Sequence, residues 1–211
     1  MPTKTFVSDV ALTADERHAE KMAKKKAAHD RIVDAKTVEK GLLIVHTGKG
    51  KGKTTAALGM VVRAIGHGQK VGVVQFVKGA MATGESQVLA AFPDQVEFKP
   101  MGDGFTWDTQ NRAQDIASAR KAWDEVERMI ADPSYGMVVA DELNIVLRYD
   151  YLPLDEVLEV LAAKPEMTHV IVTGRNAPDA LIAAADLVTE MTLIKHPFRE
   201  QGVKAQPGIE F

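Results

Sequence analysis

The residues best suited to do chemistry are concentrated in the stretch HTGKGKGKTTAALG, His46 to Gly59. Gly52, Lys53 and Thr54 form the G-K-T ending of a phosphate-binding loop, whose full pattern is G-x-x-x-x-G-K-[ST]. Glycines let successive backbone N–H groups turn toward a phosphate, and the following helix adds the positive end of its dipole. The lysine supplies a full positive charge, and the threonine hydroxyl can ligate Mg²⁺. The stretch therefore predicts a nucleoside triphosphate site.

The loop departs from the pattern at one position, because Thr47 stands where the first glycine belongs. Its flanks nevertheless fit: the apolar run LLIVHT precedes the loop and TTAALGMVVRAIG follows it, which is the strand–loop–helix context that the motif requires. The alternative is an ordinary glycine-rich turn, although such a turn has no need of Lys49 and Lys51. We predict that the nucleotide is bound by Thr47, Gly48, Lys49, Gly50, Lys51, Gly52, Lys53, Thr54 and Thr55.

A metal partner for Thr54 is expected at the end of another strand, where the stretch YGMVVADELN places Asp141 and Glu142 directly after an apolar run. Mg²⁺ at phosphate-loop sites is commonly held by the loop hydroxyl together with such a carboxylate. We predict that Thr54, Asp141 and Glu142 hold Mg²⁺, or Mn²⁺ in its place. The alternative is that Asp141 only caps the next helix. ATP is favoured over GTP, since the chain has no N-K-x-D stretch.

Short β-rich runs and helical segments alternate from residue 41 onward. The runs Val138 to Ala140 and Val170 to Val172 are apolar at consecutive positions, which is typical of parallel strands covered by helices on both faces. This pattern predicts an α/β fold: a P-loop, RecA-like domain over residues 41–211, with a mainly parallel sheet flanked by helices. Ligands of such sheets bind beyond the carboxyl ends of the strands.

Residues 1–40 differ in composition, being rich in Ala, Lys and Glu. Thr13 and Glu16 have the spacing of a capping box, and Gly41 is a candidate stop signal, so we expect an N-terminal helical arm. The run Lys24 to Lys26 could recruit phosphate, but charge runs on helices are more often solvated faces.

Overall composition excludes several classes of protein. The chain has 26 Lys and Arg against 29 Asp and Glu, a formal net charge of −3, so nothing in its total charge favours nucleic acid or anionic membrane. It contains no cysteine, which excludes thiol nucleophiles, disulfides and Cys-type zinc sites. Neither a signal peptide nor an apolar run of the ~20 residues that span a bilayer is found. We expect a cytoplasmic protein that binds neither nucleic acid nor membrane.

A second unusual segment is GFTWDTQN, which places Phe105 and Trp107 in a turn after a strand. Aromatic residues in such a turn are often core anchors. The alternative is a flat apolar wall for a large ring-shaped substrate at the ligand-binding edge of the sheet.

Taken together and in this order, the stretches TGKGKGKTTAALG, GVVQFVKG, GFTWDTQN, VVADELN, YDYLPL, VIVTGR and KHPFREQGVKAQPGIEF resemble the ATP:corrinoid adenosyltransferases of the cobalamin pathway. The resemblance covers residues 41 to the C-terminus, and Thr47 fits the family's version of the loop. It implies that a Co(I) corrinoid attacks the ribose C5′ of ATP and that the whole triphosphate leaves, with Lys53, Thr54 and Glu142 as catalytic residues.

The resemblance has further implications for the corrinoid. It implies that Phe105 and Trp107 press on the lower face of the ring and keep cobalt four-coordinate, so that a reduced flavoprotein can supply the electron. It also implies that Arg63 reaches the nucleotide, although Arg63 could instead extend to the surface, and that the enzyme is a homodimer whose arm closes over a site. Lys49 departs from the family, since many relatives carry Asn or Asp there.

Two other functions remain open on the sequence. One is a conventional P-loop ATPase or kinase, and the other is a nucleotide-dependent corrinoid-binding module without turnover. Within the family, the substrate could be cobalamin, cobinamide or cobyrinic acid a,c-diamide, because the contacts that distinguish their amide groups have no recognisable motif.

Overall fold

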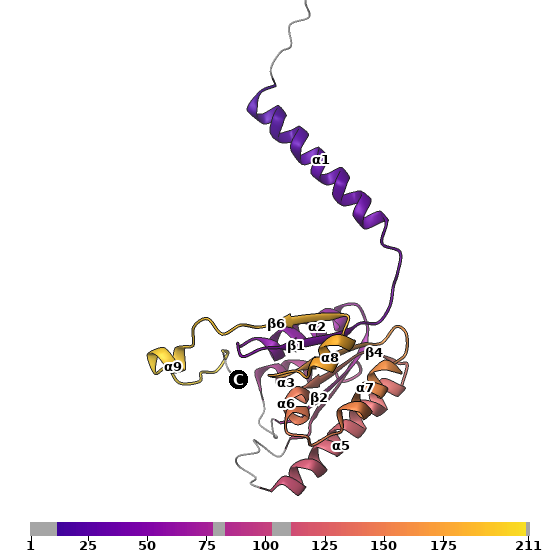
Figure 1. The fold of residues 1–211 in the computed structure, drawn as a ribbon, viewed down its shortest axis with the longest axis vertical. Coiled ribbons are helices and arrows are strands. Elements are labelled where there is room, and N and C mark those ends of the chain that lie inside the picture. The colour runs from indigo at the N-terminus through magenta and orange to yellow at the C-terminus, as the bar shows by residue number, and fades with distance from the viewer. Residues whose placement is uncertain (1–11, 78–82, 103–110, 210–211) are drawn as a thin grey trace, which may run out of the picture. The chain divides into compact units, whose positions relative to one another are not determined.

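The computed structural model describes residues 12–77, 83–102 and 111–209 of the chain. Its internal contacts divide it into two compact units, Met1–Glu39 and Lys40–Phe211 (Figure 1). Phe105 and Trp107 lie outside the described residues. Across the described ranges, no helix has the length and apolar character needed to cross a bilayer.

The first unit contains the predicted helix, α1, which runs over Ala14–Asp34. The predicted capping box is present: the Thr13 hydroxyl accepts the Glu16 N–H, and the Glu16 carboxylate accepts the Thr13 N–H. The helix ends at Asp34, well before the expected stop at Gly41. We attribute the early end to the β-branched Thr37 and Val38, which lower helix propensity beyond that point. No α1 side chain is buried.

The second unit is built on one six-stranded sheet in the order β3-β2-β4-β5-β1-β6. Every pairing between its neighbouring strands is parallel, which confirms the predicted fold class. The strands are β1 (Leu43–Thr47), β2 (Lys70–Gln75), β3 (Val96–Pro100), β4 (Tyr135–Asp141), β5 (His169–Thr173) and β6 (Leu187–Glu190).

Helices cover both faces of the sheet, because the strands alternate apolar side chains between two cores. Val139 and Ile171 belong to one of these cores, whereas Val138 and Val170 belong to the other. The helices are α2 (Lys53–Gly66), α3 (Gly84–Leu89), α5 (Arg112–Ala131), α6 (Leu143–Arg148), α7 (Leu154–Ala162), α8 (Asp179–Ala184) and α9 (Pro197–Gln201).

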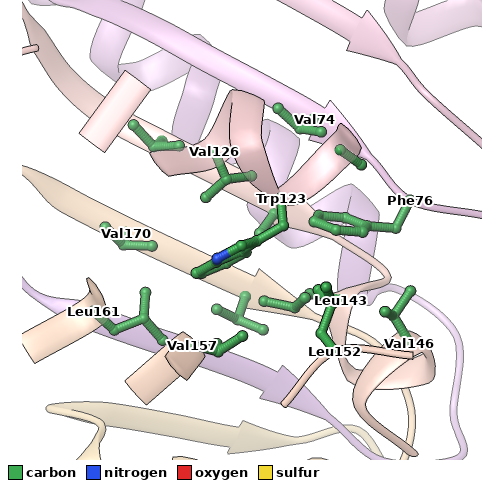
Figure 2. Close-up of a cluster of buried hydrophobic side chains, with 14 of the residues drawn as sticks. Val74, Phe76, Trp123, Val126, Leu143, Val146, Leu152, Val157, Leu161 and Val170 are labelled. Atoms are coloured by element: carbon green, nitrogen blue, oxygen red, sulfur yellow. The ribbon is translucent and has the colours of Figure 1, made fainter. Parts of the chain in front are cut away.

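Trp123 of α5 lies at the centre of the larger core. Its side chain is 0% exposed, and Figure 2 shows it among Val126, Leu143 and Val157, which come from three different helices. The ring therefore joins α5, α6 and α7 into the layer that supports the end of β4.

The strand order decides which loops meet. β5 lies between β1 and β4, with Val45 opposite Val172 and Ala140 opposite Val172 on its other side. Because all three strands run in the same direction, their carboxyl ends share one edge of the sheet. The phosphate loop after β1 and the acidic residues that end β4 are thereby brought together.

A polar network ties the start of β4 to the edge strand β3. The Tyr135 hydroxyl donates to the Glu97 carboxylate, Arg128 Nη2 donates to Glu97 Oε1 at 2.7 Å, and Lys99 Nζ lies 3.3 Å from the same oxygen. Partial burial raises the pKa of Glu97, but the hydrogen bonds from Tyr135, Arg128 and Lys99 outweigh it and lower this pKa to about 2.

This network predicts a loss of stability in acid. Since the Glu97 pKa is lower in the folded chain than its unfolded value near 4.5, the stabilisation is complete above pH 4.5 and disappears as the pH falls toward 2. We expect roughly 1–2 kcal/mol, less than the full shift implies, because solvent screens a partly exposed pair. Urea unfolding of wild type and Glu97→Gln should differ at pH 6, and the difference should shrink steadily as the pH is lowered from 4.5 toward 2. A difference that does not change with pH would contradict this assignment.

Candidate functional site

The phosphate loop is a tight backbone turn between β1 and α2. Gly48 and Gly52 have φ of 97° and 103°, in the left-handed region that glycine adopts without strain. At Gly48 a Cβ would also lie 2.5 Å from the Met191 carbonyl oxygen, so only glycine fits there. The Gly50 N–H donates to the same oxygen at 2.6 Å. The segment after β6 therefore packs directly against the loop.

Lys53 is held inside this turn. Its Nζ donates to the carbonyl oxygens of Gly48 at 2.9 Å and Gly50 at 2.5 Å, and the residue is only 8% exposed. Burial lowers the pKa of Lys53, the charge of Glu142 raises it, and the positive charges of Arg175 and Lys51 lower it further. An ammonium in such a cage can exchange a carbonyl partner for a phosphate oxygen, which carries a full negative charge.

Asp141 is the polar centre of the site and is 0% exposed. Its Oδ1 accepts from the hydroxyls of Thr54 at 2.8 Å and Thr173 at 2.7 Å, and its Oδ2 accepts from Gln75 Nε2 at 2.9 Å. The structure thus brings Thr54 and Asp141 together, as the sequence predicted. Because the Thr54 hydroxyl hydrogen points to Asp141, the oxygen lone pairs are left for a metal.

Glu142 follows Asp141 in an unusual backbone conformation, with φ of 68°. Its N–H donates to the Thr173 hydroxyl at 2.9 Å. A left-handed conformation costs a non-glycine residue about 1–2 kcal/mol and persists only where the surroundings impose it. Glu142 is the residue at the start of α6, with no side-chain cap bond, and Asp141 points into the site instead. The alternative that Asp141 only caps the helix is therefore wrong.

The Thr54 hydroxyl and the carboxylates of Asp141 and Glu142 are hard oxygen donors, which suit Mg²⁺. Within the described ranges, no group of three or more His, Asp and Glu side chains is placed to hold a metal ion. A metal here would therefore rely on Thr54, the two carboxylates and the substrate phosphates, which is how Mg²⁺ is usually held at nucleotide sites.

The other residues that were predicted to bind the nucleotide differ in burial and in distance from Lys53. Thr47 is buried at the end of β1, while Lys49, Lys51 and Thr55 are exposed around the loop. Arg63 is exposed in the last turn of α2, about 15 Å along the helix axis from Lys53, so the structure does not bring it to the loop.

Sequence reasoning did not assign roles to Gln75 and Thr173. Both are buried polar residues at the last position of an apolar strand, β2 and β5. A polar residue that ends a buried parallel strand at the ligand edge is the signal that could have identified them. Their contribution is to orient the Asp141 carboxylate.

The chain is similar to known proteins along most of its length. Residues 39–211 match the family model described as ATP:corrinoid adenosyltransferase BtuR/CobO/CobP, and residues 8–33 match the model described as Cob(I)alamin adenosyltransferase N terminal. A corrinoid adenosyltransferase from a Sinorhizobium species is 58% identical over 93% of this chain and 92% of its own. The corresponding Pseudomonas aeruginosa protein is 54% identical over 93% and 97%. The protein of that name from Escherichia coli K12 is 48% identical over 94% of this chain and 100% of its own.

Proposed function

Because the chain belongs to the ATP:corrinoid adenosyltransferase family, we propose that it transfers the 5′-deoxyadenosyl group of ATP to the cobalt of a reduced Co(I) corrinoid and releases triphosphate. The single structural observation that supports this proposal is the buried Lys53 ammonium inside the phosphate loop, beside the Thr54–Asp141 pair. These groups are suited to hold a highly charged leaving group.

The proposed reaction is a displacement at carbon. The Co(I) centre supplies an electron pair to the ribose C5′, the bond from C5′ to the triphosphate oxygen breaks, and that bond's electrons leave with the triphosphate. Cobalt is thereby oxidised to Co(III) while the new cobalt–carbon bond forms. Negative charge develops on the departing oxygen, so preorganised donors and cations at the phosphates stabilise the transition state.

The residues of the phosphate loop and of the strand ends have different roles in this reaction. Lys53 would bind the phosphates by exchanging its bonds to the loop carbonyl oxygens for bonds to phosphate oxygens. The positive end of the α2 dipole lies at the same loop, because α2 begins at Lys53. Thr54, Asp141 and Glu142 would hold Mg²⁺ or Mn²⁺, which would neutralise part of the phosphate charge. Thr173 and Gln75 keep the Asp141 carboxylate oriented toward Thr54.

The contacts to the corrinoid and to partner proteins rest on the family alone. We propose that Phe105 and Trp107 contact the lower face of the ring, that a reduced flavoprotein supplies the electron, and that two copies of the chain form a homodimer. Residues 1–40 would form a separate arm, and residues 41–211 would bind both nucleotide and corrinoid. A contact from Arg63 to the nucleotide also stays a prediction.

Product analysis tests the proposed function. The full chain is incubated with ATP, Mg²⁺ and chemically reduced cobalamin, cobinamide or cobyrinic acid a,c-diamide, and the cobalt–carbon bond is followed by its absorbance. We expect one triphosphate for each adenosylated corrinoid formed. ADP and phosphate without adenosylation would indicate a conventional ATPase instead. ATP binding without turnover of any of the three corrinoids would indicate a binding module.

A further inference from the structure

The loop that follows β5 is fastened to the site at three points. Thr173, the last residue of β5, donates its hydroxyl hydrogen to Asp141 and accepts the Glu142 N–H at the start of the loop. The Gly174 carbonyl accepts from Asn144 Nδ2 at 3.1 Å. The Ala177 N–H donates to the Thr47 hydroxyl, also at 3.1 Å. Residues 174–177 are thus held between the start of α6 on one side and the beginning of the phosphate loop on the other.

The backbone of this loop is tightly constrained. Gly174 and Asn176 both have positive φ, 126° and 55°. At Gly174 a Cβ would lie only 2.8 Å from the Asn144 side chain, which shows how closely the loop packs on α6. Asn176 is not a glycine, and its left-handed conformation persists where neighbouring groups impose it, as the bonds from Asn144 and Thr47 do on either side of it.

Arg175 lies between these anchors and has no assigned role. Its side chain is exposed, and it forms no hydrogen bond or ion pair with the residues that the structure describes. The loop that carries it is bonded to Thr47 at the start of the phosphate loop and follows Thr173, which is bonded to Asp141, so Arg175 lies at the same edge of the sheet as the phosphate loop. A guanidinium forms two parallel hydrogen bonds to a phosphate, which makes it well suited to bind a polyphosphate that Lys53 already holds.

We propose that Arg175 binds the triphosphate of the nucleotide and that Thr47 is the residue that positions it. This inference extends the proposed function and rests on it for the identity of the ligand. It also gives a physical reason for the missing glycine of the phosphate-loop pattern. Glycine at position 47 would leave the Ala177 N–H without its hydroxyl acceptor, and the loop that carries Arg175 would lose its attachment to β1.

Binding of inorganic tripolyphosphate with Mg²⁺, measured by calorimetry, tests this proposal without requiring the adenosyl transfer. We expect Arg175→Ala to weaken binding by roughly 10–100-fold, as the loss of a charged bidentate contact does. Thr47→Val, which keeps the shape but removes the hydroxyl, should weaken it by about 5–10-fold. Thr47→Ser keeps the hydroxyl and should bind within about threefold of wild type.

The double variant separates positioning from a direct effect on the phosphate loop. If Thr47 acts through Arg175, then adding Thr47→Val to Arg175→Ala should cause no further loss, because coupled residues are not additive. Equal losses from Thr47→Val in both backgrounds would overturn the positioning role. Tripolyphosphate binding by Arg175→Ala within twofold of wild type would overturn the contact itself.

Two further measurements keep the test decisive. Circular dichroism and thermal melting establish that each variant is folded. If Thr47→Val does not fold, Asn144→Ala removes the second anchor of the loop and should show the same non-additivity with Arg175→Ala. The proposed function is tested by a different result, the products formed from ATP. If the chain passes these binding tests but converts ATP to ADP and phosphate, the Arg175 contact stands and the adenosyl transfer does not.

Discussion

Replacing Lys53 with alanine should lower the rate of adenosyl transfer from a chemically reduced Co(I) corrinoid by roughly 10²–10³-fold, the range seen when one preorganised charge-stabilising group is removed. The Lys53 ammonium is buried within the phosphate loop, where the Gly48 and Gly50 carbonyl oxygens hold it in place. Its interaction with the phosphates grows as negative charge develops on the leaving oxygen, so kcat should fall more than affinity for ATP. Single-turnover kinetics with excess enzyme measures the chemical step directly.

Two controls make this result interpretable. Lys121→Ala removes a lysine from the exposed surface of α5 and should leave the rate unchanged. Thermal melting of Lys53→Ala checks that loss of the bonds to the Gly48 and Gly50 carbonyls has not unfolded the loop's surroundings. A rate within about threefold of wild type in a folded Lys53→Ala chain would remove Lys53 from the proposed mechanism.

Trp123→Ala should be among the most destabilising single substitutions, at about 3–5 kcal/mol, because it leaves a large cavity in a fully buried core. For a domain of this size that loss lowers the melting temperature by roughly 6–20 °C. Trp123 joins the helices that support the end of β4 (Figure 2), so the cavity also removes support from the strand that carries Asp141. Urea unfolding followed by circular dichroism measures the effect.

Trp123→Phe is the matched variant. The indole Nε1 is buried and has no hydrogen-bond partner among the residues that the structure describes. Phenylalanine keeps most of the ring but removes this unsatisfied donor, which offsets part of the loss of packing. We expect Trp123→Phe to cost about 1 kcal/mol. If both substitutions cost the same, the contribution of Trp123 does not come from filling the core.

The parts of the site that were predictable are contiguous in sequence or follow from a general rule of parallel sheets. The loop from Gly48 to Thr54 is one uninterrupted motif whose flanks indicate a strand and a helix. The approach of Asp141 to Thr54, residues 87 positions apart, was also predictable, because both follow strands whose carboxyl ends share an edge. The metal itself and the roles of Phe105, Trp107 and Arg63 stay predictions.

Other features depend on which strands are neighbours, and the sequence does not state strand order. The order β4-β5-β1 places Thr173 between the phosphate loop and the acidic pair, so that one hydroxyl contacts both Asp141 and the Glu142 N–H. The bond between Thr47 and Ala177 likewise joins positions 130 residues apart. No local pattern marks either contact, because hydroxyl groups at strand ends look alike in sequence whatever they face.

The sequence alone determined that this chain is a parallel α/β protein with a nucleotide loop and an acidic partner strand, because hydrophobic periodicity and glycine spacing are local consequences of backbone geometry. Only the tertiary structure decided that Lys53 is caged by its own loop, that Asp141 accepts hydrogen bonds from three side chains, and that Thr47 anchors the loop carrying Arg175. These are directional contacts between distant segments, and a hydrogen bond forms only where the folded sheet brings donor and acceptor within about 3 Å of each other.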